Sequence, residues 1–152
     1  MKFTYETDIG DITIGASDAA ITHINLHADA VPGEIGETPL IKEAYVQLCD
    51  YLAGVRWDFD LPIEPAGTPF QLSVWRALCD VGYGKTASYK DIARTIGNEK
   101  SVRAVGGANN KNPILIVIPC HRIIGSSGDL VGYGGGLPLK KKLLALESQH
   151  ER

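Results

Sequence analysis

The feature that most constrains the fold is a change of hydrophobic pattern at the segment EPAG, residues 64–67. Before it, residues 2–27 alternate apolar and polar side chains, the two-residue period of half-buried β-strands. After it, apolar residues recur at three- and four-residue intervals, which is typical of helices packed on a core. The pattern predicts an α+β chain of two domains, residues 1–63 built on a sheet and residues 64–152 mainly helical.

The charge changes sign at the same place. Residues 1–66 contain 3 Lys or Arg and 12 Asp or Glu, and residues 67–152 contain 12 and 6, so the net charge of −3 is the sum of −9 and +6. A basic domain joined to an acidic one favours a polyanion partner such as a nucleic acid. A chance difference between two solvated surfaces is the alternative.

Composition excludes several other classes of protein. No apolar run approaches the roughly 20 residues that span a bilayer, and the acidic, alternating N-terminus is unlike a secretory signal. The three cysteines, Cys49, Cys79 and Cys120, are an odd number without CxxC spacing. This favours a reducing compartment over a disulfide framework or a zinc site. We expect a protein of the cytoplasm, or of the nucleus in a eukaryote, with no membrane contact, metal or cofactor.

In the first domain we expect a three-stranded antiparallel meander, followed by a helix from Thr38-Pro39 to about Gly54. Thr38 is the expected N-cap and Pro39 the first helical residue. The strands are predicted at residues 2–6, 11–15 and 20–26, with a further short strand at 57–62.

In the second domain a helix is expected to begin at Thr68-Pro69 and to run to about Val81. The sequence SYKD at residues 88–91 has capping-box spacing and predicts a helix that ends near Gly97. A second short helix at 101–109 gives the pair helix-turn-helix proportions. Further elements are expected as a buried strand at 114–118, a short wing hairpin after it, and a helix at 138–148.

The second helix of this pair is unusually rich in small residues, with Ala104, Gly106, Gly107 and Ala108. Glycine inside a helix costs roughly 1 kcal/mol relative to alanine. Small residues permit a close approach to another surface. The sequence alone favours neither of two interpretations, in which this surface is DNA or a neighbouring helix.

The sequence IVIPCHR places Cys120 and His121 directly after an apolar run. Positive charge on His121 and Arg122 would favour a reactive thiolate, whereas Cys49 and Cys79 lie on apolar helix stripes and fit buried packing residues. Neighbours in an extended chain point to opposite faces, so we expect His121 to act through water, with Glu147 holding its tautomer. A cysteine hydrolase is disfavoured because His23, His27 and His150 have no telling context.

Five ordered blocks resemble the O6-alkylguanine-DNA alkyltransferase family: SYKDIA, VRAVGGANNKNP, ILIVIPCHRII, GYGGGL and LLALE. The resemblance covers residues 68–147. It implies a ribonuclease H-like N-terminal domain and a C-terminal domain that transfers the alkyl group of O6-alkylguanine, and less well of O4-alkylthymine, to its own cysteine. The reaction is expected once per protein, on double-stranded DNA bound through the minor groove without sequence preference. A monomer is expected, binding DNA alone or cooperatively.

The resemblance also implies a role for each matching residue. Cys120 is the expected acceptor, His121 the water-linked base, Glu147 its orienting carboxylate and Asn112 the brace of the active-site turn. Tyr89 is expected to favour base extrusion and to bond the flipped guanine, and Arg103 to fill the vacated stack. The remaining expected DNA contacts are Ala104, Gly106, Gly107, Lys111 and Arg122. The expected substrate-pocket residues are Tyr133, Gly134, Gly135 and Lys140.

Two departures and one alternative accompany this resemblance. Some relatives carry an N-terminal zinc site, but here Cys49 is the only cysteine of the first domain and Asp60 stands where a histidine ligand would be expected. We therefore predict no zinc. The alternative function is a non-catalytic lesion-binding or regulatory helix-turn-helix protein, against which the presence of Cys120 argues.

Overall fold

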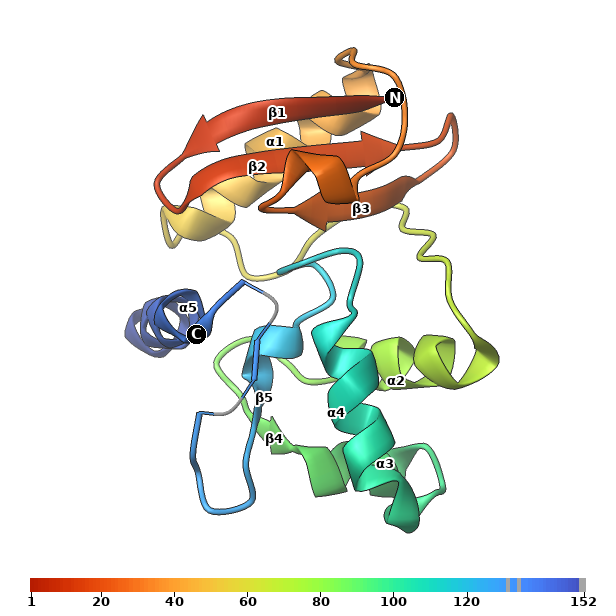
Figure 1. The fold of residues 1–152 in the computed structure, drawn as a ribbon. Helices are drawn as coiled ribbons and strands as arrows, with labels where there is room; N and C mark the ends of the chain where they lie inside the picture. The colour runs from red at the N-terminus through yellow and green to blue at the C-terminus, as the bar shows by residue number, and fades with distance from the viewer. Residues whose placement is uncertain (131, 134, 151–152) are drawn as a thin grey trace. The chain divides into compact units, whose positions relative to one another are not determined.

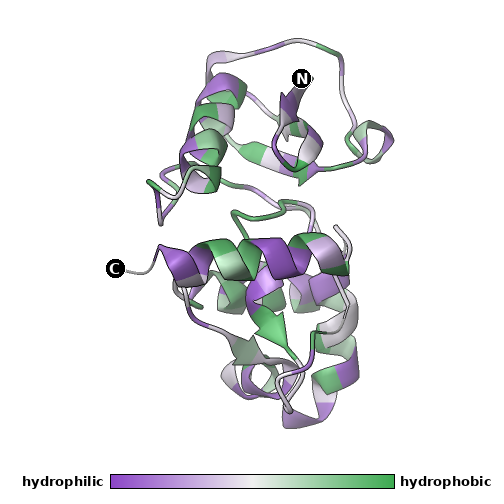
Figure 2. Cartoon of the chain, turned by 90° about the vertical axis from the view of Figure 1, so that its left-hand side faces the viewer, coloured by the Kyte–Doolittle hydropathy of each residue, from purple (hydrophilic) through white to green (hydrophobic). Residues whose placement is uncertain are grey.

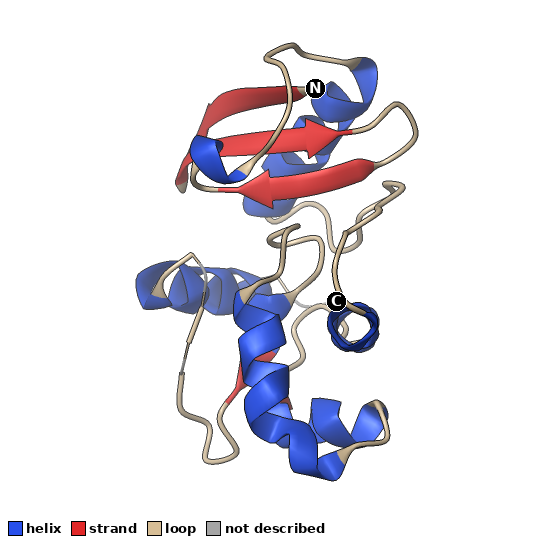
Figure 3. Cartoon of the chain, turned by 45° about the vertical axis from the view of Figure 1, so that its right-hand side comes forward, coloured by secondary structure: helices blue, strands red, loops and turns tan. Residues whose placement is uncertain are grey.

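The computed structural model describes residues 1–130, 132–133 and 135–150. The chain divides into two units, one of Met1–Ala66 with Pro113–Leu115 and one of Gly67–Asn112 with Ile116–Arg152. Figure 3 shows a sheet with helices in the first unit and mostly helices in the second. This arrangement confirms the predicted α+β class. The predicted domain boundary at 63/64 stays a prediction, because a compact unit is not by itself an independently folding domain.

The first unit is built on a three-stranded antiparallel meander, β1 (Lys2–Thr7), β2 (Gly10–Ala16) and β3 (Ile21–Asn25), in the order β1-β2-β3. Cross-strand pairs such as Tyr5↔Ile12 and Ile14↔Ile24 place buried side chains opposite one another. The meander therefore follows the alternation of the sequence, because its apolar positions form one buried face. A short 3-10 turn, η1 (Ala28–Ala30), follows.

Helix α1 (Pro39–Leu52) begins where the sequence predicts. Thr38 is its N-cap, and the Thr38 Oγ1 accepts a hydrogen bond from the Ile41 backbone N–H at 3.2 Å. The helix packs against the sheet (Figure 1) through an apolar stripe. Its buried apolar residues are Ile41, Ala44, Leu48 and Tyr51.

The predicted strand at 57–62 is wrong. The described backbone there forms no strand and only Ile63 makes an isolated bridge, to Ile21. The Gln47 side chain donates to the Asp60 carbonyl at 3.1 Å and accepts from the Asp60 N–H at 2.9 Å. A side-chain amide from α1 thus takes the hydrogen bonds that a strand partner would supply.

The second unit begins with α2 (Pro69–Cys79), followed by β4 (Ala87–Ser88) and α3 (Tyr89–Thr95). The predicted capping box of α3 is present, because the Ser88 Oγ accepts from the Asp91 N–H at 3.0 Å and the Asp91 carboxylate accepts from the Ser88 N–H at 2.9 Å. The chain reverses direction after α3 at Gly97, which has φ +77°. The short 3-10 turn η2 (Glu99–Ser101) and helix α4 (Val102–Asn110) follow. The helix-turn-helix pair is therefore α3 and α4 (Figure 1).

The core of the second unit lies between α2, α3 and α4. Val74, Leu78, Ile92 and Val105 are all buried. Trp75 is also buried, and its indole N–H donates to the Ala108 carbonyl of α4 at 2.9 Å. This hydrogen bond fixes the end of α4 relative to α2.

The apolar run at 114–118 is buried but is not the predicted strand. Ile114 forms one isolated bridge, and the chain turns at residues 116–117. Ile116 has φ +72°, the one non-glycine residue in the left-handed region within the described part of the chain. That conformation costs a β-branched residue about 1–3 kcal/mol. Hydrophobicity alone does not separate a buried strand from a buried turn.

After the turn η3 (Cys120–Arg122), strand β5 (Ile123–Ile124) pairs with β4 in parallel, as Ala87↔Ile123 and Ser88↔Ile124. Where the sequence predicts a wing of two hairpin strands, the structure has a loop. The Gly125 N–H closes this loop by donating a hydrogen bond to the Asp129 carbonyl at 2.8 Å. Helix α5 (Leu137–Gln149) is the last described element, and hydrophobic and hydrophilic bands alternate along it (Figure 2). No described helix is long and apolar enough to cross a membrane.

Candidate active site

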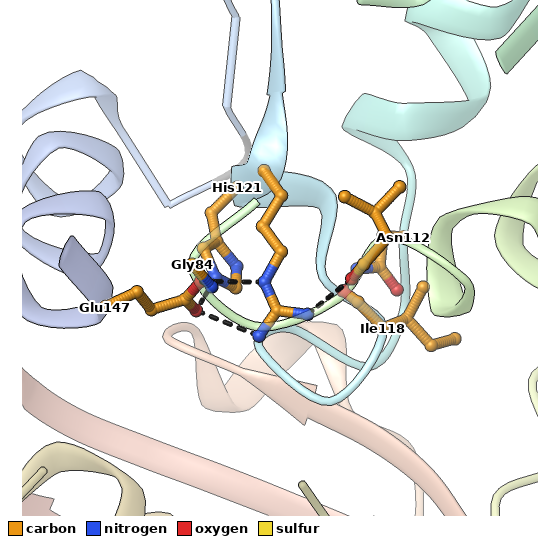
Figure 4. A network of polar contacts seen from close by, with 7 residues as sticks. Gly84, Asn112, Ile118, His121 and Glu147 are labelled. Carbon is orange, nitrogen blue, oxygen red and sulfur yellow. Dashed lines mark hydrogen bonds and ion pairs between the residues drawn. The ribbon is translucent and has the colours of Figure 1, made fainter. Parts of the chain in front are cut away.

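Cys120 is the first residue of η3, directly after Pro119, and its side chain is 0% exposed. The turn replaces the extended chain that the apolar run suggested. Its thiol is held from the segment just after α4, because the Asn112 amide donates to the Cys120 Sγ at 3.1 Å and to the Ile118 carbonyl at 2.7 Å. Figure 4 shows Asn112 beside Ile118 at this turn.

A second amide reaches the same turn. The Asn109 Nδ2 donates to the Cys120 carbonyl at 3.4 Å, and Asn109 is 1% exposed. The end of α4 and the residues just after it therefore contact Cys120 at both the main chain, through Asn109, and the thiol, through Asn112. Asn109 was not expected to contact Cys120, and its place three residues before Asn112, at the end of the predicted helix, is the signal that could have found this contact.

The thiol is protonated at neutral pH. Burial raises the pKa of Cys120 to about 11, although the Asn112 hydrogen bond and the nearby charge of Lys140 act in the opposite direction. The expectation that His121 and Arg122 would favour the thiolate is not met, because both side chains are hydrogen-bonded to Glu147. A thiolate at Cys120 therefore needs a base.

Glu147 is buried on α5, and its carboxylate accepts hydrogen bonds from several groups around it (Figure 4). His121 contacts its Oε2 through Nε2 at 2.6 Å, and the Gly84 N–H donates to Oε1 at 3.1 Å. Arg122 donates from Nε to Oε1 at 2.8 Å and from a terminal nitrogen to Oε2 at 3.0 Å. A buried carboxylate with this many donors is fixed in position.

The protonation states follow from these contacts. Burial raises the pKa of Glu147, but the hydrogen bonds from His121 and Arg122 outweigh it and lower the value to about 2. The ionised carboxylate only accepts, so His121 Nε2 carries the proton. Burial lowers the pKa of His121, although Glu147 acts in the other direction. The imidazole is therefore neutral, with the lone pair on Nδ1.

Arg122 is not placed as a surface contact for DNA. It is 7% exposed, and besides Glu147 it donates to the Val81 carbonyl at 2.7 Å. Its guanidinium also lies over the Tyr83 ring, 5.7 Å from the ring centroid. The sequence could not separate these alternatives, because a guanidinium is equally suited to a phosphate and to a carboxylate.

The expected pocket residues lie beside this network where they are described. Lys140 is 0% exposed, and its Nζ donates to the Gly132 carbonyl at 3.2 Å. Tyr133 is buried, and among the described residues its hydroxyl has no hydrogen-bond partner. Gly135 is partly buried, and Gly134 lies outside the described residues.

The expected DNA contacts on α4 lie on its open side. Arg103, Ala104, Gly107 and Lys111 are exposed, and Gly106 is partly buried. A Cβ added at Gly107 would have no described atom within 4 Å, and one at Gly106 would meet the Tyr89 ring at 3.8 Å. Packing within the chain therefore gives no reason for glycine at 107.

Tyr89 begins α3 directly after β4, and β5 directly follows η3. The β4–β5 pairing therefore brings Tyr89 toward the Cys120 turn. Its side chain is partly buried, and burial, followed by the charge of Cys120, raises the pKa of its hydroxyl. The hydroxyl stays protonated at neutral pH and is a hydrogen-bond donor.

The remaining cysteines and histidines are distributed over both units. Cys49 is partly buried, but Cys79 is exposed at the end of α2, so its predicted burial is wrong. His23 and His27 belong to the first unit, and His150 bonds the Leu146 carbonyl. Across the described residues, no three His, Cys, Asp or Glu side chains are grouped so as to hold a metal ion.

A helix-turn-helix unit that holds a buried cysteine next in sequence to a His–Glu pair is the arrangement expected of a DNA-binding protein with a cysteine nucleophile. Two family profiles match the chain. They are the 6-O-methylguanine DNA methyltransferase DNA binding domain, over residues 69–149, and the ribonuclease-like domain of the same proteins, over residues 1–65. The chain belongs to the 6-O-methylguanine DNA methyltransferase family.

Relatives match over nearly the whole length. The chain is 44% identical to the methylated-DNA–protein-cysteine methyltransferase of Methanosarcina barkeri, over 97% of this chain and 96% of that protein. It is 45% identical to the enzyme of the same name from Mycolicibacterium paratuberculosis, over 97% and 92%. The crystal structure of Mycobacterium tuberculosis OGT in complex with DNA has a TM-score of 0.91 and 40% identity, over 98% of this chain and 93% of that chain.

Proposed function

We propose that this protein repairs DNA by moving the alkyl group of O6-alkylguanine, and less well of O4-alkylthymine, to the Cys120 Sγ. Family membership and the methyltransferase names of its relatives support the activity. The observation that carries the assignment of residues is the Cys120 thiol, hydrogen-bonded by Asn112 and adjacent in sequence to the His121–Glu147 pair.

The transfer needs a thiolate, which this site does not supply without a base. His121 takes the thiol proton through a water molecule, and Glu147 holds the imidazole in the tautomer with its lone pair on Nδ1. The Cys120 Sγ then attacks the alkyl carbon. The S–C bond forms as the bond from that carbon to O6 of guanine breaks, and guanine leaves with the electron pair and takes up a proton.

The donors around the thiol stabilise the developing charges. The Asn112 amide donates to Sγ, and Lys140 lies close enough for its charge to lower the pKa of the thiol. We assign Tyr133, Gly135 and Lys140 to the pocket around the leaving guanine. Preorganised donors of this kind are worth most in a buried site, where water does not compete.

The guanine O6 is out of reach inside a duplex, so the nucleotide must be flipped out of the stack at a cost of a few kcal/mol. We assign the flipping of the nucleotide to residues of α4 and of the start of α3. Arg103 is exposed on α4 and would fill the vacated stack, and Tyr89 would crowd a phosphate and bond the flipped base. An inserted side chain compensates part of the lost stacking.

The open side of α4 suits the minor groove. Ala104, Gly106 and Gly107 add little bulk, and Lys111 provides a cation beside them. The minor groove distinguishes few sequences, which suits repair of lesions in any sequence context. We propose that a monomer binds in this way, alone or cooperatively along the DNA, in the cytoplasm, or in the nucleus of a eukaryote.

Removing the alkyl group from the thioether product would require a second nucleophile, and the proposed mechanism provides none. We therefore propose one transfer per protein molecule, without a cofactor.

Intact-protein mass spectrometry after incubation with a duplex containing O6-methylguanine tests this function. We expect a mass gain of one CH2 unit, equimolar with the duplex consumed and absent in Cys120→Ala. A Cys120→Ala protein that still binds the duplex separates a chemical defect from a binding defect. Unchanged mass with retained binding would favour the lesion-binding alternative.

The same assay tests flipping if it is run on the duplex and on free O6-benzylguanine. Arg103→Ala should slow transfer from the duplex much more than transfer from the free base, because only the duplex requires extrusion. Equal losses on both substrates would contradict the role of Arg103.

A further inference from the structure

The contacts of Arg122 are not used by the chemistry proposed above. The side chain is buried, and its nitrogens donate to both oxygens of Glu147 and to the Val81 carbonyl. Three directed hydrogen bonds from one guanidinium fix both the carboxylate and the loop before β4. A surface cation held for DNA would not be placed this way.

Arg122 also affects the charge balance around Glu147. Glu147 is a buried anion in contact with a buried imidazole. Without a permanent cation on the carboxylate, the imidazole is the nearest group able to balance its charge, and it would do so by taking a proton. A protonated His121 is no longer a base.

We propose that Arg122 is a positioning residue for alkyl transfer, which balances the charge of Glu147 so that His121 stays neutral, with its Nε2–H on Glu147 and its Nδ1 as the proton acceptor. The inference rests on the proposed function, since it concerns the base of that reaction. Arg122 acts through Glu147 and does not touch the reacting atoms.

Other titratable groups around the pair do not replace Arg122. Lys140 also acts on His121 and on Cys120, but its Nζ donates to the Gly132 carbonyl. Tyr83 lies against Arg122, and the pKa of its phenol is raised, mainly by burial, so it is neutral. Burial likewise raises the pKa of the Tyr133 phenol, which is also neutral. Arg122 is therefore the cation in direct contact with Glu147 among the described residues.

Nitrogen-15 NMR of the histidine rings in the full-length, unreacted protein tests this inference. In the wild type, His121 should give the signature of a neutral ring protonated at Nε2 across neutral pH. In Arg122→Met, the same ring should take up its proton at a higher pH than in the wild type. Arg76→Met is the matched control, because it removes an exposed cation from α2 and should leave His121 unchanged.

Two results would overturn the inference: an imidazolium at His121 in the wild type at neutral pH, or unchanged titration of His121 in Arg122→Met. If Arg122→Met does not fold, Arg122→Gln serves instead, since it keeps hydrogen-bond donors without the charge. The wild-type measurement stands even if neither variant folds.

The rate of methyl transfer against pH separates this inference from the proposed function. The acid limb of the Arg122→Met profile should move to higher pH, so that the variant loses most rate under mildly acidic conditions and recovers under alkaline ones. A uniform loss at every pH would indicate a purely structural role. A wild-type protein that gains no mass would instead refute the proposed function and leave the NMR result standing.

Discussion

At the scale of single residues, the proposed nucleophile is protonated in the resting protein and lies beside a group that would stabilise its charged form. The Cys120 thiol has a pKa of about 11, and the Asn112 amide is the described hydrogen-bond donor on its sulfur. A neutral thiol gains little from such a donor, whereas a thiolate gains a charge-assisted hydrogen bond. We therefore expect Asn112 to stabilise the transition state of the proposed transfer more than the resting protein.

Asn112→Ala should raise the pKa of Cys120 further and slow methyl transfer at neutral pH. A hydrogen bond to a charged group is worth roughly 1.5–3 kcal/mol, which corresponds to a rate loss of about tenfold to a hundredfold. Single-turnover rates against pH measure both effects. Asn25→Ala, which removes an amide bonded to the His27 N–H in the first unit, is the control. A loss below threefold or so would show that the hydrogen bond to sulfur is not used in the transfer.

At the scale of elements, α4 combines two demands that favour different sequences. Its buried side carries Val105, Ala108 and Asn109, which hold it to the unit and to Cys120. Its open side carries Gly107, where a helix gains stability from almost any other residue. Glycine at position 107 therefore lowers the stability of α4 on its exposed side.

Gly107→Leu should therefore raise the free energy of unfolding by roughly 0.5–1 kcal/mol, while weakening binding to duplex DNA. The two effects have opposite signs because the added side chain meets no described atom of the protein but would meet the DNA. Chemical denaturation and duplex titrations measure them. Ala145→Leu, at an exposed position of α5, is the control for added apolar surface. Unchanged DNA affinity in Gly107→Leu would contradict the assigned face.

The elements that could be predicted from the sequence are those specified locally. The alternation of residues 2–27, the Thr38 and Ser88 caps and the glycine turn at 97 each depend on neighbours in the chain. The segments at 57–62 and 114–118 were mistaken for strands. The first is held by Gln47 from α1 and the second bends at Ile116, and neither influence is visible in the local pattern.

The identity of most site residues could be predicted from the sequence, but the hydrogen bonds between them could not. The motif around Cys120 and the resemblance to a known family indicated the residues that gather there. The pairing of Arg122 with Glu147 was missed, because it joins residues 25 positions apart and competes with a plausible DNA contact. The Gly84 N–H and the Val81 carbonyl were also missed, since main-chain groups carry no sequence signal.

At the scale of the whole molecule, the buried site links stability to pH. The lowered pKa of His121 means that the unfolded chain binds a proton near pH 6.5 while the folded chain does not. The lowered pKa of Glu147 means that its contribution is present above about pH 4.5 and is lost as pH falls toward about 2. Both shifts destabilise the folded state in acid.

The free energy of unfolding should accordingly begin to fall as the pH drops below about 6.5 and continue to fall through the carboxylate range. His121→Gln should reduce the first part of this loss, although His23, whose pKa burial also lowers, would leave some of it. Urea unfolding midpoints over this pH range provide the measurement. His27→Gln, at an exposed position, should leave the profile unchanged. A flat wild-type profile down to about pH 5 would contradict a neutral buried His121.

The hydrogen bond from Trp75 to the Ala108 carbonyl makes this indole an optical reporter of α4. The chain has two tryptophans, and Trp57 lies in the first unit, so Trp57→Phe would leave one fluorophore, attached to the helix assigned to DNA. Indole emission depends on the polarity and hydrogen bonding around the ring. Docking, base extrusion and alkyl transfer could then be timed as separate fluorescence phases in one unlabelled protein.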